Sequence, residues 1–143
     1  GWLKLKKYKF KIYNMQEYKN KIKFNQAYLD FMNQIFEIEK KSSNLKEDNS
    51  IQRNINKMKG IMEGEFFKGT STIGLSYHNP LGESYSDTRT DCEATISGTS
   101  VENLEIIEVI KPIIFYAFQE NDKTMKIIVQ PAVVIVQSKN INQ

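Results

Sequence analysis

The spacing of hydrophobic positions follows two different periods along this chain, and the period changes near residue 64. At the start, apolar side chains alternate with lysines, which is the period of a β-strand. The apolar positions here are Leu3 and Leu5 and, after a slip at Lys7, Tyr8, Phe10 and Ile12. This pattern predicts a basic strand or free arm over residues 1–13, with a bulge at the slip.

Two helical patterns follow. Over residues 15–41, apolar residues recur at spacings of three and four with no Gly or Pro between them, which predicts a helix packed against another element. Its apolar positions are Phe24, Tyr28, Phe31, Met32, Ile35, Phe36 and Ile38. A polar loop over 42–50 separates it from a second helix over 51–62, whose apolar face carries Ile51, Ile55, Met58 and Met62. Gly60 and Gly64 mark the expected end of that helix.

From Glu65 onward the period is two. Alternation predicts strands near 72–77, 91–96, 113–118, 124–130 and 132–137, with turn residues between them. Residues 101–111 fit either a helix or a strand, and their β-branched content favours a strand with a slip at Ile106–Ile107. Pro112 should end an element, and Pro131 suggests an edge position or a bulge.

This order of elements predicts an α+β fold: a basic N-terminal strand and two helices, followed by an antiparallel sheet of about five strands. We divide the chain into an arm over 1–13, a helical segment over 14–63, and an antiparallel β region over 64–139. The helical segment and the β region are expected to pack as a single domain, because each exposes an apolar face that needs cover. Residues 140–143 form a tail.

Charge divides the chain in the same way. Residues 1–59 contain 14 of the 20 Lys and Arg but 6 of the 17 acidic residues, whereas 60–143 contain 6 and 11. Such asymmetry concerns partners rather than fold. At 143 residues, the chain is long enough to bury a core without a disulfide or metal, and its one cysteine cannot form an internal bridge. No apolar run is long enough for a membrane span.

His78 and Cys92 are the only imidazole and the only thiol, so a Cys–His nucleophile is the sharpest enzymatic hypothesis. If strands 73–77 and 91–96 pair with Ile73 opposite Ile96, then Tyr77 faces Cys92 and His78 faces Asp91 on the opposite, polar face. That register turns the thiol to the core and the imidazole to solvent, which argues against a dyad. A small enzyme using His78 with Asp91 or Asp87 remains an alternative.

Carboxylates gather near the same turn: Glu83, Asp87, Asp91 and Glu93. Their spacing matches no calcium-loop pattern, and we interpret them as a solvated acidic face. The stretch Lys68-Gly69-Thr70-Ser71 precedes a predicted strand rather than a helix, so it does not match a phosphate-binding loop. We therefore predict no metal and no cofactor.

Residues 4–23 hold eight lysines interleaved with aromatic residues, a composition suited to binding single-stranded nucleic acid. Arginine, the usual reader of bases and phosphates, occurs only at positions 53 and 89. Nucleic-acid binding through Lys4–Lys23 is therefore an alternative. Trp2 followed by lysines would also suit the cytoplasmic side of a membrane exit, which would require a span upstream of Gly1.

We expect a non-enzymatic structural or interaction subunit of a larger assembly, such as a phage particle or a secretion or conjugation apparatus. It would form a homo- or hetero-oligomer with protein partners through its N-terminal strand and helices, because a lysine-lined strand suits addition to a neighbour's sheet. The predicted contact residues are Trp2, Leu3, Leu5, Tyr8, Phe10 and Ile12. Neither a location nor a particular partner follows from the sequence.

Overall fold

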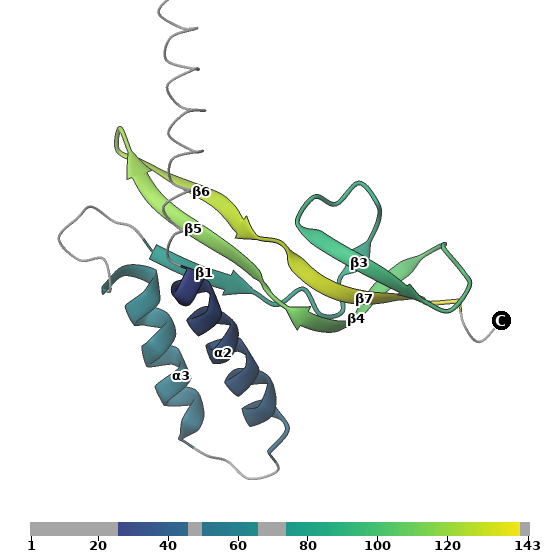
Figure 1. Cartoon of the computed structure of the whole chain (residues 1–143), viewed down its shortest axis with the longest axis horizontal. Helices are drawn as coiled ribbons and strands as arrows, with labels where there is room; N and C mark the ends of the chain where they lie inside the picture. Colours follow the sequence, from purple (N-terminus) through teal and green to yellow (C-terminus); the bar gives the residue numbers. More distant parts are fainter. Residues whose placement is uncertain (1–25, 46–49, 66–73, 141–143) are drawn as a thin grey trace, which may run out of the picture.

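The computed structural model describes residues 26–45, 50–65 and 74–140 (Figure 1). The predicted strand over 2–13 and the first part of the predicted helix lie outside these residues. The helices are α2 (Gln26–Ser43), α3 (Ile51–Gly60) and a π-helical turn, η1 (Ile61–Glu65). The strands are β1 (Gly74–His78), β2 (Ser84–Tyr85), β3 (Cys92–Ser97), β4 (Leu104–Lys111), β5 (Ile113–Glu120), β6 (Lys123–Gln130) and β7 (Ala132–Ser138). The predicted α+β class is confirmed.

The strands form two sheets, not the single antiparallel sheet that the sequence predicts. Sheet A has the order β1-β5-β6, and sheet B has the order β2-β4-β7-β3. All pairs are antiparallel except β3 and β7, which run parallel. The expected pairing of the strands that carry Tyr77 and Cys92 is therefore wrong, because β1 pairs with β5 and β3 pairs with β7.

One long two-stranded ribbon joins the sheets, and two prolines divide it. Only Pro112 separates β4 from β5, and only Pro131 separates β6 from β7. The pairs on either side of the break, Lys111 with Val133 and Ile114 with Gln130, keep the ribbon in register. A proline has no N–H to donate, so the ladder of hydrogen bonds stops at this level in both strands. The prediction that Pro112 ends an element is confirmed.

The ambiguous segment 101–111 forms β4, so the preference for a strand is confirmed. Its register against β7 shifts between Ile106 and Glu108, which makes Ile107 the extra residue of a bulge. The slip expected at Ile106–Ile107 is thus confirmed. A second shift lies between Val109 and Lys111.

Helices α2 and α3 lie side by side against one face of sheet A (Figure 1). The cluster of buried side chains between them combines both layers, and its members are Leu29, Met32, Ile35, Ile55, Met62, Leu75, Ile114, Tyr116, Phe118 and Ile127. Burying side chains of this size contributes about 1.5–3 kcal/mol each. This apolar contact is what holds the helices in place.

A second buried cluster belongs to sheet B, and strands supply nearly all of it. Its members are Phe36, Cys92, Leu104, Ile106, Val109, Ile113, Ala132, Val134 and Val136. Phe36 is the one helical residue among them, so α2 reaches both clusters.

Polar contacts fix α2 where the two sheets meet. The side chains of Asn33 and Gln130 exchange two hydrogen bonds of 3.0 Å, and Gln130 also donates to the carbonyl of Pro112 at 3.0 Å. Two turns further along the helix, Lys40 donates to the carbonyl of Val109 at 3.0 Å. The helix therefore ties the ribbon on both sides of its break.

Candidate functional site

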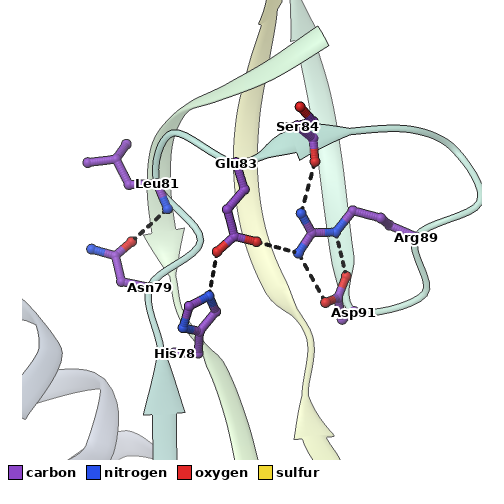
Figure 2. Close-up of polar contacts among 7 residues, drawn as sticks. All are labelled: His78, Asn79, Leu81, Glu83, Ser84, Arg89 and Asp91. Carbon is purple, nitrogen blue, oxygen red and sulfur yellow. Dashed lines mark hydrogen bonds and ion pairs between the residues drawn. The ribbon is translucent and has the colours of Figure 1, made fainter.

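The densest polar network of the β region lies on the connection from β1 to β3 (Figure 2). His78 ends β1 and contacts the Glu83 carboxylate through Nε2. The other carboxylate oxygen of Glu83 lies 3.1 Å from Arg89. Arg89 in turn holds Asp91 with two hydrogen bonds, from Nε at 2.8 Å and from a terminal nitrogen at 3.0 Å, and donates to the Ser84 carbonyl at 3.0 Å.

The charges in this network satisfy one another. Hydrogen bonds from Arg89 hold the pKa of Asp91 below its ordinary value, and those to Asp91 raise the pKa of the Arg89 guanidinium. Both oxygens of Glu83 are engaged, as are all three nitrogens of the guanidinium. Such an arrangement locks the connection between the two sheets.

The histidine and the cysteine point to different environments. The side chain of His78 is 53% exposed, whereas Cys92 is only 7% exposed. Burial raises the pKa of the Cys92 thiol to about 11, so the thiolate needed for nucleophilic attack is disfavoured. The expected orientations are confirmed, although the strand register from which they were inferred is wrong.

The link between His78 and Asp91 that the sequence suggests is indirect. In the described network Glu83 contacts His78, and Arg89 contacts Asp91, so two side chains separate the suggested pair. The acidic face expected from the sequence is also divided, because Glu83 and Asp91 share Arg89 while Asp87 and Glu93 are exposed. Within residues 26–45, 50–65 and 74–140, no group of three or more His, Cys, Asp or Glu is placed to hold a metal ion.

A second network, which the sequence did not indicate, joins both helices to β1. The Tyr77 hydroxyl donates to Glu39 at 2.9 Å, and Gln52 donates to the same carboxylate at 3.1 Å. Lys59 lies 3.6 Å from Glu39 and 4.7 Å from the centre of the Tyr77 ring. These contacts connect residues far apart in the chain, so no local pattern could have revealed them.

The pKa shifts in this second network reflect its burial and its charge. Burial alone would raise the pKa of Glu39, but the hydrogen bonds from Gln52 and Tyr77 and the charge of Lys59 outweigh it and lower the pKa. Burial and then the bond to Glu39 raise the pKa of the Tyr77 phenol. The network stabilises the helix–sheet contact.

An apolar stripe is formed by Phe31 and Ile38 on the outward face of α2 and by Leu45, which lies two residues beyond the end of the helix at Ser43. These side chains lie seven residues apart and are 52%, 42% and 54% exposed. The sequence placed Phe31 and Ile38 among the packed residues of the helix. Their neighbours Met32, Ile35 and Phe36 are indeed buried, but the stripe itself faces outward. The apolar pattern was wider than one packed face could bury, and that excess width was the available signal.

The contact residues predicted from the sequence, Trp2, Leu3, Leu5, Tyr8, Phe10 and Ile12, lie outside the described residues, as do Lys4–Lys23. Among the helices of the described part of the chain, none combines the length and the apolar character needed to cross a membrane.

Comparisons with known proteins add no identification. No family model matches the chain, and neither curated proteins nor solved structures show a significant match to it.

Proposed function

We propose that this protein is a non-enzymatic interaction subunit that associates with protein partners through its helices and its N-terminal segment. The observation that carries this proposal is the stripe of Phe31 and Ile38 on the outward face of α2, with Leu45 just beyond the helix, next to a helix face that is fully packed. Neighbouring large apolar side chains exposed along one helix face are typical of a contact surface, whereas isolated exposed residues are ordinary.

The spacing of the stripe supports a helical partner. Apolar residues at intervals of seven lie on one line along a helix, and helices that pack at a shallow angle meet along such lines. Gln34 and Lys41, which lie between these positions, are also exposed and leave the line accessible. A second copy of α2, or a similar amphipathic helix of another subunit, fits this geometry.

The polar networks support a non-enzymatic role. The single imidazole is engaged with Glu83, and the single thiol is buried with a raised pKa. We assign the network around Arg89 to holding the connection between the sheets. A phage particle or a secretion or conjugation apparatus would use a subunit of this kind.

The test replaces two stripe residues in the full chain, Phe31→Gln together with Ile38→Gln, and measures mass against concentration by light scattering. We expect association to weaken at least tenfold while the thermal unfolding temperature stays unchanged, because both side chains are largely exposed. The matched control, Leu81→Gln with Val101→Gln, removes two apolar side chains that are 56% and 69% exposed in loops, and it should associate normally. Equal association of both double variants would refute a role for the α2 stripe.

A further inference from the structure

Open sheets present edges where another strand can add, and the two sheets here have four. At the β1 edge, η1 lies very close to the strand. A Cβ atom added at Gly74 would lie 1.8 Å from the carbonyl oxygen of Glu63. At β6, Lys123 and Lys126 line the strand. The remaining two edges belong to sheet B.

The edges of sheet B differ from each other. On one side, β2 has only two residues, so most of β4 forms that edge. β4 is bulged, and Lys40 binds its Val109 carbonyl, so this edge is irregular. β3 is regular over all six of its residues, and within the described residues its outer side has no neighbouring strand. It is therefore the edge best suited to accept another strand.

The direction of its free backbone groups follows from the pairing with β7. The N–H of Ala132 donates to the carbonyl of Asp91 at 2.9 Å. In a parallel ladder, the N–H and C=O of one residue point to the same side, and successive residues alternate. Asp91, Glu93 and Thr95 therefore bond toward β7. The residues whose N–H and C=O point to the open side are Cys92, Ala94 and Ile96.

The two faces at this edge have different chemistry. One face carries Glu93 and Thr95, and the register through β7 brings Glu105 and Glu108 of β4 onto the same face, with Lys111 at its end. The opposite face is apolar and carries Cys92, Ala94 and Ile96, of which Ile96 is 40% exposed. A strand that suits this edge would alternate basic and apolar side chains.

We propose that residues 8–12 of a second copy of this chain add to the open edge of β3. This segment alternates as the edge requires, with Tyr8, Phe10 and Ile12 on one side and Lys9 and Lys11 on the other. The lysines lie on the same face as Glu93 of the adjacent strand, and the apolar residues lie beside Ala94 and Ile96. The same lysines are repelled by the lysine-bearing edge of β6.

The chain between the added segment and α2 limits the reach of this contact. Thirteen residues, 13–25, separate residues 8–12 from Gln26, and a fully extended chain covers roughly 3.3 Å per residue, so the segment can reach at most on the order of 40 Å from the start of α2. This inference rests on the proposed function, because it names the site at which one subunit receives the next.

The first test is Ala94→Pro in the full chain. Proline removes the outward N–H of Ala94 while leaving the bonds to β7 in place, and edge strands tolerate proline at such positions. We expect association, measured as particle mass against concentration by light scattering, to weaken at least tenfold with an unchanged circular dichroism spectrum, while any contact through the α2 stripe remains. Association as tight as that of the unaltered chain would overturn the inference.

Charge reversal supplies a second test that does not depend on tolerance of proline. Glu93→Lys should weaken association about three- to tenfold, since it places like charges across the pair. Adding Lys9→Glu should restore it. The matched control Glu102→Lys makes the same charge change at an exposed residue before β4 and should leave association unchanged. Failure of Lys9→Glu to restore association would contradict the pairing.

The double variant Tyr8→Asp, Phe10→Asp distinguishes failure of the β3 inference from failure of the proposed function. If that variant is monomeric while the β3 variants still associate, the N-terminal segment binds elsewhere and only this inference fails. If the unaltered chain is monomeric at every concentration, the proposed function fails as well. Binding of residues 8–12 to β3 of their own chain would appear as a monomer whose mass no β3 variant changes, and it would also overturn the inference.

Discussion

Sheets A and B are built on the same ribbon, yet they are supported differently. Sheet A is covered on one face by α2 and α3, and half of its buried cluster comes from helical residues and η1. Sheet B has one helical residue, Phe36, in its cluster and depends on contacts among its own strands. The comparison shows how two prolines at one level of a ribbon separate a half supported by helices from a half in which β3, within the described residues, is an edge strand (Figure 1).

The largest expected effect comes from the residue that joins the halves. Phe36 is 1% exposed and belongs to the sheet B cluster. Its ring lies edge-on to the Tyr77 ring, with the two ring centroids 5.6 Å apart. Phe36→Ala should lower the free energy of unfolding by about 3–5 kcal/mol, since it leaves a cavity between the sheets and α2. Urea denaturation measures this.

The control for Phe36 is on the same helix. Phe31→Ala removes the same side chain from a position that is 52% exposed, and it should change stability by no more than about 0.5 kcal/mol. Equal losses at the two positions would mean that α2 does not pack as described.

A smaller loss of stability is expected when the close contact between η1 and sheet A is disturbed. A Cβ atom at Gly74 would meet the backbone of Glu63 at 1.8 Å, so Gly74→Ala must displace η1 or β1. We expect a loss of about 1–3 kcal/mol. Gly60→Ala is the matched change, because nothing lies within 4 Å of its Cβ position, and there alanine should be neutral or stabilising. A neutral Gly74→Ala variant in thermal denaturation would argue against this contact.

The smallest effect concerns the connection into sheet B and depends on pH. Asp91 has a lowered pKa in the folded state because of Arg89, so it contributes stability above its unfolded pKa of about 4. That contribution is lost as the pH falls through the folded value. Arg89→Gln should cost about 1 kcal/mol at pH 7, because the pair is partly exposed. In urea titrations the difference from the unaltered protein should shrink as the pH falls below the unfolded value, and a difference independent of pH would contradict this account.

Much of the fold followed from local pattern. The two helices, the strand over 101–111 with its slip at Ile107, and the break at Pro112 were all predicted, because periodicity and proline act within a few residues. The pairing of strands was not predicted. Neighbouring strands along the chain usually pair, but β1 pairs with the distant β5, and β3 lies parallel to the distant β7.

The candidate site was predictable only in part. Composition placed His78 and Cys92 in different environments, which the structure bears out. The partners of Arg89 and of Glu39 depend on how strands and helices assemble, so the sequence did not indicate them. The outward stripe on α2 was present in the pattern, but its direction depends on which face the sheet covers.

The most direct test of the central claim is the mass of the unaltered full chain, measured by light scattering across a range of concentrations at moderate salt. A subunit that binds its neighbour through an open edge and a helix face should give masses at or above twice 16.6 kDa as concentration rises. A constant mass of 16.6 kDa over the whole range, with nothing else bound, would contradict the account.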